Sequence, residues 1–282
     1  MATITINTNL ASLTAQRNLS QATTGMNTAM ERLTTGYRIN SGKDDAAGAA
    51  VSNLMEAQIS AYDVAESNAT MGLTLLDTAE GVLDIVGDYV QRIRDLTEQA
   101  ANGTYSDDSR AAIKAEIESR LAEIDRIAGS AEYNGMLLMT GATGEVSIQV
   151  GVDGSDNSKV KLTDALFSDA KASTILGKAN ATMATNCSGA ATAAGELATI
   201  DAAIDNISNR VTTLGASQNR LESAIDSIQV TTENLTSSLS TVKDADIATE
   251  STRYLQAQIL QSAATTLLST ANQTPSIALQ LI

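Results

Sequence analysis

LATIDAAIDNISNRVTTLGASQNRLESAIDSIQVTTENLTSSLSTV, residues 197–242, decides the fold because its apolar residues recur at alternating steps of three and four, interrupted only at Gln218 and Thr232. These positions are Leu197, Ile200, Ile204, Ile207, Val211, Leu214, Leu221, Ile225, Ile228, Leu235, Leu239 and Val242. Such spacing, sustained without proline, predicts one long helix whose narrow apolar seam lies against other helices. This helix would span roughly 70 Å, whereas a compact globule of this chain length is roughly 50 Å across. We therefore predict a mainly α fold, an elongated helical rod of the kind typical of structural proteins.

The amino-acid composition supports long helices and excludes most enzyme chemistry. The 282 residues include one Phe, six Tyr, no Trp and a single proline, Pro275. Histidine is absent and Cys187 is the only cysteine, so imidazole catalysis, imidazole or thiolate metal sites and intramolecular disulfides are excluded. No nucleophile motif or phosphate loop is visible, although a carboxylate pair among the 33 acidic residues stays open. We expect no enzyme, no cofactor and no metal, with Cys187 an incidental thiol.

Charge is unevenly distributed along the chain. The net charge of −15 argues against nucleic acid and anionic lipid as partners. Residues 1–40 carry +2 and residues 253–282 carry +1, so the segment between them carries −18. Residues 254–282 have no charged side chain, but their glutamines, serines and threonines argue against membrane insertion. We therefore expect both ends to pack against protein. The start of the chain lacks a signal peptide pattern, so any export would use another route.

Other periodic segments predict further helices on both sides of the middle of the chain. We expect them over residues 10–33, 44–101 and 108–128, with a terminal helix that Pro275 ends. The predicted domains are a terminal helical domain, residues 1–42 plus 245–282, and a rod domain, residues 43–244. The two end helices would be marginal alone, because they have few large apolar residues and no bundle around them. We expect them to become stable only when neighbouring copies cover them.

The middle of the chain carries the strand signal. Apolar residues alternate with polar ones over Val146–Val152 and again at Val160 and Leu162, which predicts one hairpin over about residues 146–162. Its acidic turn lacks the spacing of a calcium-binding loop, so a plain turn is the interpretation. Residues 163–192 are rich in Ala, Ser, Thr and Gly with weak periodicity. We expect them to form an irregular or surface-exposed variable stretch.

Short motifs occur in order over both ends of the chain. They are INTNLASL (6–13), LTTGYRINSGKDDAAG (33–48), QRIRDL (91–96), QAANGT (99–104), EIDRI (123–127), YNG (133–135), DADIATE (244–250), QAQILQ (256–261) and ANQ (271–273). Together they resemble bacterial flagellins over residues 1 to about 140 and 193–282. Only residues 141–192 lack a counterpart that we can name.

This resemblance implies a function without chemistry. Flagellins pass unfolded through the flagellar type III export channel, served by an export chaperone, and polymerise beneath a cap into a hollow extracellular filament that acts as the propeller for motility. Copies of the chain itself, the cap and the hook-associated proteins are then the expected partners. Paired terminal helices line the inner tube, and the rod with its hairpin forms the outer tube. Longer relatives insert outer domains where residues 141–192 stand, so the resemblance implies a thin filament of tube domains alone.

The resemblance also implies two sets of contact residues. In the family, the stretch equivalent to residues 92–103 contributes to subunit contacts, and part of this region is recognised on monomers by Toll-like receptor 5. Arg92, Leu96 and Glu116 match the receptor-contacting pattern, and Gln99 and Arg120 complete the set of residues expected at subunit or receptor contacts. In the end helices, the apolar residues expected to drive assembly are Leu10, Leu13, Ile259 and Leu267.

Two other interpretations stay open at this point. A hook-filament junction protein shares flagellin-like ends and a rod, but forms a single ring layer. A secreted coiled-coil effector or adhesin would be a stable monomer or small oligomer, and would leave the uncharged ends unexplained. Indefinite polymerisation distinguishes the filament subunit from both.

Overall fold

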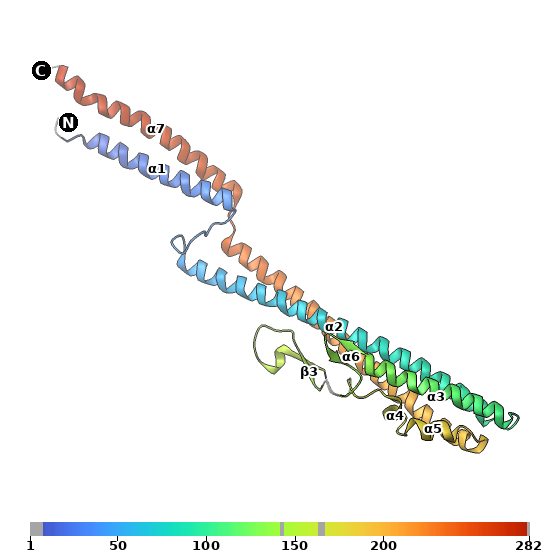
Figure 1. Cartoon of the computed structure of the whole chain (residues 1–282). Helices are drawn as coiled ribbons and strands as arrows, with labels where there is room; N and C mark the ends of the chain where they lie inside the picture. Colours follow the sequence, from blue (N-terminus) through green and yellow to red (C-terminus); the bar gives the residue numbers. More distant parts are fainter. Residues whose placement is uncertain (1–7, 142–143, 163–166, 281–282) are drawn as a thin grey trace. The chain divides into compact units, whose positions relative to one another are not determined.

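The computed structural model describes residues 8–141, 144–162 and 167–280, with the backbone alone for residues 274–280 (Figure 1). This part of the chain is mainly helical, as predicted. The α-helices are α1 (Leu10–Thr35), α2 (Ala46–Ala101), α3 (Asp107–Ser130), α4 (Ala172–Ile175), α5 (Asn180–Asn186), α6 (Ala190–Lys243) and α7 (Ile247–Gln280). The strands are β1 (Glu132–Tyr133), β2 (Met136–Leu137), β3 (Val146–Gln149) and β4 (Lys159–Leu162).

The chain divides into two compact units. The first contains residues 1–59 and 233–282, and the second contains residues 60–232. The division falls within α2 and α6, whereas the sequence places the domain boundary at the joint near residues 42 and 245. The boundary at the joint stays a prediction.

Helix ends follow local signals. Gly36 ends α1 in the left-handed conformation (φ +75°), which glycine adopts without steric cost. The Asp45 carboxylate accepts a hydrogen bond from the Ala47 N–H at 3.1 Å and so caps the start of α2. Ser106 caps α3 by accepting a hydrogen bond from the Ser109 N–H at 3.2 Å. The helix starts predicted at residues 10, 44 and 108 are therefore confirmed to within a few residues.

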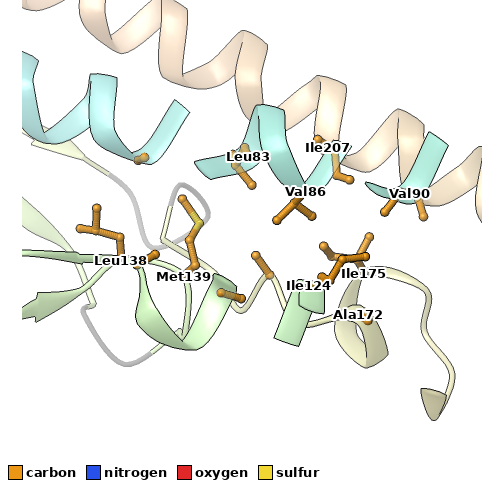
Figure 2. Packing of buried hydrophobic residues seen from close by; sticks show 14 of the residues in the cluster. Leu83, Val86, Val90, Ile124, Leu138, Met139, Ala172, Ile175 and Ile207 are labelled. Carbon is orange, nitrogen blue, oxygen red and sulfur yellow. The ribbon is translucent and has the colours of Figure 1, made fainter. Parts of the chain in front are cut away.

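The core of the second unit lies among α2, α3 and α6 (Figure 2). Each helix contributes apolar residues at steps of three and four, as the sequence pattern predicts. The buried residues of α2 and α3 include Leu76, Leu83, Val86, Val90, Ile93, Ile117, Leu121 and Ile124, and those of α6 include Ile200, Ile207, Leu214 and Leu221. Each of these helices therefore covers the seam of the others within this unit.

The predicted hairpin is confirmed. β3 pairs antiparallel with β4 so that Ile148 faces Val160, and both side chains are buried against the helices. A second strand pair, β1 with β2, was not predicted. Asn134-Gly135 forms the tight turn between these strands, with positive φ at both residues. Helix α3 ends before this turn, at Ser130.

The expectation of an irregular or surface-exposed stretch at residues 163–192 is wrong for the residues that the structure describes; residues 163–166 lie outside them. Residues 167–189, here called the capping segment, contain α4 and α5. The segment buries Phe167, Ala170, Ala172, Ile175, Leu176, Met183, Ala184 and Cys187 in the core. Asp125 of α3 holds the segment by accepting hydrogen bonds from the Ala172 N–H at 2.8 Å and from Asn180 Nδ2 at 2.6 Å. Small residues suit this close packing, which explains the weak periodicity.

The expectation that Pro275 ends the terminal helix is also wrong, because α7 continues to Gln280. Proline within a helix removes one backbone hydrogen bond, to the carbonyl four residues earlier. Here that carbonyl belongs to Ala271, and it accepts a hydrogen bond from Asn9 Nδ2 at 2.7 Å. A donor from α1 thus replaces the missing one.

Candidate functional site

The terminal helix pair, α1 with α7, is held by an alanine seam. Along α1, the buried residues Ala15, Ala22 and Ala29 recur at steps of seven, and Ala257 and Ala264 do so along α7. Alanine side chains let two helix backbones approach closely, and Cα atoms of the two helices lie within 8 Å of each other at many levels. The pair therefore closes largely through small residues. Leu19, Met26, Leu33 and Leu268 are half-buried, and the other large aliphatic side chains that the structure describes on the pair are exposed.

The predicted assembly residues all point away from the seam. Leu10 is 74% exposed, Leu13 58%, Ile259 68% and Leu267 63%. Further exposed apolar side chains on the pair are Met30, Ile247, Leu255 and Leu260. Exposed leucines and isoleucines at this density, on helices with few charges, indicate a surface that packs against protein.

A groove of about 650 Å³ runs along the pair. Its floor is formed by Ala22, Gly25, Ala29, Ala257, Leu260, Ala263 and Ala264. At one end lies the carboxylate of Glu250, which is 5% exposed and accepts hydrogen bonds from Arg32 Nη1 at 3.1 Å and Arg253 Nη1 at 2.7 Å. Because two arginines pair with this carboxylate, they offset the free-energy cost of burying its charge. The rest of the groove is mostly apolar.

The joint at the base of the pair is a short backbone crossing. The Arg38 N–H donates to the Lys243 carbonyl at 2.7 Å, and the Ala245 N–H donates to the Gly36 carbonyl at 2.8 Å. The Lys243 ammonium pairs with Glu56 and lies 4.6 Å from the centre of the Tyr37 ring. The hydrogen bond to Glu56 raises the pKa of Lys243. The sequence motif around Gly36 therefore joins the segment after α1 to the segment before α7.

The predicted receptor-like residues lie on α2 and α3. Glu116 accepts hydrogen bonds from Arg120 at 2.8 and 3.1 Å and pairs with Arg92 at 3.5 Å, and the Arg120 guanidinium lies 5.9 Å from the Tyr89 ring centre. The hydrogen bonds from Arg120 hold the pKa of Glu116 below its usual range. We call Arg92, Glu116 and Arg120 the arginine–glutamate cluster. It is partly exposed, as is typical of a contact surface that carries charge.

The other two predicted residues, Leu96 and Gln99, are not part of this cluster. Gln99 is exposed on α2, whereas Leu96 is buried at 2% exposure and belongs to the core. The structure therefore brings three of the five residues into direct contact. It places the Leu96 side chain beneath the surface.

The described part of the chain contains neither a candidate metal-ligand cluster nor a candidate membrane span. Among the described residues, no group of three or more acidic or cysteine side chains is arranged to hold a metal ion. No helix among them is both long and apolar enough to cross a membrane. Cys187 is buried beside Thr97, and burial raises the pKa of its thiol.

Sequence reasoning missed the residues that hold the pair together. Ala15, Ala22 and Ala29 were available as a repeat of seven, but alanine is too common here to stand out. Asn9 lies inside the INTN motif, yet its partner is more than 260 residues away and only the fold brings them together. The charge count of the ends gave no sign that Glu250 would be buried.

Comparison with known proteins agrees with this arrangement. Residues 6–143 match the bacterial flagellin N-terminal helical region, and residues 197–282 match the bacterial flagellin C-terminal helical region. The flagellin of Listeria monocytogenes is 37% identical over 288 residues, which cover 98% of this chain and 99% of that protein. The flagellar filament 33 kDa core protein of Treponema phagedenis is 35% identical, with the same coverage. A solved structure described as a flagellar hook-associated protein from Vibrio parahaemolyticus shares the fold, with a TM-score of 0.60 and 18% identity over 71% of this chain and all of that chain.

The fold and the outward apolar faces define a helical structural protein that associates through its ends. With relatives of more than 30% identity along almost its whole length, the chain belongs to the bacterial flagellin family. It is a structural subunit of the flagellar filament, which is an extracellular part of the flagellum built by self-assembly. The family is one of structural proteins and not of enzymes.

Proposed function

We propose that the terminal helix pair drives polymerisation of this chain into a hollow filament made of tube domains alone. The observation that carries the proposal is the outward orientation of Leu10, Leu13, Ile259 and Leu267 around a seam of alanines. Burying one exposed leucine between copies is worth about 1.5–3 kcal/mol, so several such side chains together supply a strong driving force. The contacts are heterologous and repeat along an open helix. The −18 middle segment stays hydrated and keeps single copies soluble.

Electron microscopy of the purified full chain with short filament seeds tests this proposal. We expect long, uniform tubes without outer projections. Leu267→Gln should suppress their growth, because it places an amide where apolar contact is needed. Ser269→Gln, at an exposed polar position on the same helix, is the matched control and should polymerise normally.

Two outcomes of the same experiment would contradict the filament role. Rings of a single layer would favour the hook-filament junction alternative. A chain that stayed a monomer or a small oligomer with every seed and precipitating salt would favour a secreted effector or adhesin.

The proposed route to the filament is type III export with the help of an export chaperone, followed by insertion beneath the cap onto the hook-associated proteins. What supports it is the family membership and the uncharged ends. Expression in a flagellated bacterium that lacks its own flagellin tests this route. We expect the chain in the medium or on the cell, and its retention inside cells with an intact export apparatus would contradict the proposal.

We propose a second role, recognition of the monomer by Toll-like receptor 5. The arginine–glutamate cluster and the exposed Gln99 of α2 form the candidate contact, whereas Leu96 is buried in the core. A receptor-reporter assay tests it: Arg92→Ala with Arg120→Ala should weaken the response at least tenfold. Arg126→Ala removes a comparable exposed arginine, paired with Glu123, and should leave the response unchanged. An equal response from all variants would contradict this role.

A further inference from the structure

The helix α7 contains a built-in gap in its hydrogen bonding. Pro275 has no amide hydrogen, yet the helix continues past it to Gln280. The carbonyl of Ala271 therefore loses the donor that any other residue at position 275 would provide. A carbonyl left without a donor in a packed setting costs free energy, so a donor from elsewhere is favoured at this point.

The structure supplies that donor from the opposite helix. Asn9 Nδ2 donates to the Ala271 carbonyl oxygen at 2.7 Å, while Oδ1 of the same side chain accepts from the Ser12 N–H at 3.0 Å and caps α1. Ser12 Oγ also donates to Asn272 Oδ1 at 2.7 Å. One amide thus serves both helices, with its oxygen on its own helix and its nitrogen on the other.

The seam by itself specifies the register weakly. Because alanines recur at steps of seven on both helices, a shift of one heptad would again place alanine against alanine. Polar groups that need particular partners select one register in coiled coils. Near the joint, the ion pair of Arg32 with Glu250 selects the register, and further along the hydrogen bond from Gln261 to Thr23 does so. At the far end, Asn9 with Ala271 and Ser12 with Asn272 make such contacts.

We propose that Asn9 is a positioning residue that fixes the register at the far end of the terminal helix pair, by donating to the Ala271 carbonyl that Pro275 leaves without a backbone donor. The register decides which outward leucines of α1 and α7 lie side by side. In this respect the inference deepens the proposed assembly function and rests on it. The contact itself lies within one chain, so it can be tested without filaments.

A disulfide equilibrium in the full chain measures the population of this register. The background variant is S12C with N272C and C187A, so that the two introduced thiols stand where Ser12 and Asn272 touch. Their effective concentration against a glutathione buffer reports how often the observed register forms. Asn9→Asp keeps a side-chain oxygen that can cap α1 but has no side-chain N–H to donate. We expect it to lower the effective concentration about fivefold or more.

Pro275→Ala provides the decisive comparison. It returns a backbone N–H to the Ala271 carbonyl, so Asn9→Asp should then lower the effective concentration less than twofold. Gln16→Glu adds the same charge at an exposed position of α1 and should change little in either background. An Asn9→Asp effect of equal size with and without Pro275, or no effect at all, would overturn the proposal.

Polymerisation of the same variants separates this inference from the proposed function. If the disulfide equilibrium behaves as expected but the parent chain forms no filament, the assembly function fails and the role of Asn9 stands. If the parent polymerises but Asn9→Asp leaves the disulfide equilibrium unchanged, the positioning role fails and the assembly function stands.

Discussion

Gly72 marks the closest approach of the β3–β4 hairpin to α2. A Cβ atom at this position would lie 2.2 Å from Ile148 Cδ1 and 3.2 Å from Leu221 Cδ1. Gly81, on an exposed face of the same helix, would meet nothing within 4 Å. The two glycines therefore separate the steric requirement at this contact from helix propensity.

We predict that Gly72→Ala lowers the free energy of unfolding by about 1–2 kcal/mol, because overpacking outweighs the gain in helix propensity. Gly81→Ala should instead raise it by up to about 1 kcal/mol. Urea denaturation followed by circular dichroism measures both. Ile148→Val removes the clashing Cδ1 atom and should recover part of the loss in the Gly72→Ala chain. A stabilising Gly72→Ala would contradict the packing described.

At the scale of elements, the buried carboxylate of Glu196 on α6 holds the capping segment, in addition to Asp125 of α3. Lys178 Nζ donates to both oxygens of Glu196 at 2.8 Å, and Asn186 Nδ2 donates to Oε1 at 2.6 Å. Burial alone would raise the pKa of Glu196, but the hydrogen bonds from Lys178 and Asn186 outweigh it and lower the pKa below its ordinary value of 4.5. The stabilisation is therefore present above pH 4.5 and is lost as the pH falls through the folded-state pKa.

Cys187, buried within the capping segment, reports its opening. We predict that Glu196→Gln speeds labelling of this thiol by 4,4′-dithiodipyridine roughly tenfold at pH 6, because the Lys178 charge loses its partner. The ratio of variant to parent rates should fall towards one as the pH drops through the lowered folded-state pKa of Glu196, because the parent carboxylate is then protonated too. Glu118→Gln, in an exposed pair with Lys114, is the control. A ratio that does not change with pH would contradict the role of this carboxylate.

The alanine seam leads to a prediction about the terminal pair. Ala29 is 2% exposed between α1 and α7, so Ala29→Leu should force the helices apart at a cost of about 1–3 kcal/mol. We expect the critical concentration for polymerisation, measured by sedimentation, to rise about tenfold or more. Ala11→Leu adds the same side chain on the exposed face of α1 and should leave the critical concentration unchanged or lower it. Equal effects of both changes would argue against the seam.

These elements also show how far sequence alone reaches. The long helices were predictable because their large apolar residues repeat over many turns, and Gly36 and Ser106 are local signals. The capping segment was not, because α4 and α5 are short and their burial depends on α3 and α6. Helix α7 passes Pro275 because Asn9 compensates for the missing N–H, which no local pattern contains. For the terminal pair, the exposed leucines could be named in advance, but the alanine seam that turns them outward could not.

At the scale of the whole molecule, the two compact units have separate sources of stability. The buried cluster of the second unit extends from Leu75 to Leu221 along the chain and, among the residues whose side chains the structure describes, includes none of α1 or α7. The first unit depends on the seam, on the joint at Gly36 and Ala245, and on the proposed contacts between copies. Loss of α7 should therefore abolish assembly and leave the second unit folded.

Deletion of residues 254–282 tests this separation. It removes Ala257 and Ala264 from the seam and Ile259 and Leu267 from the outer face, so α1 loses its partner helix. We predict that the shortened chain forms no filaments at concentrations where the full chain does, by electron microscopy and sedimentation. The thermal transition of the second unit should stay within about 3 °C of that in the full chain, since a cost of 1 kcal/mol there corresponds to roughly 2–4 °C. Normal polymerisation of the shortened chain would show that the second unit alone drives assembly.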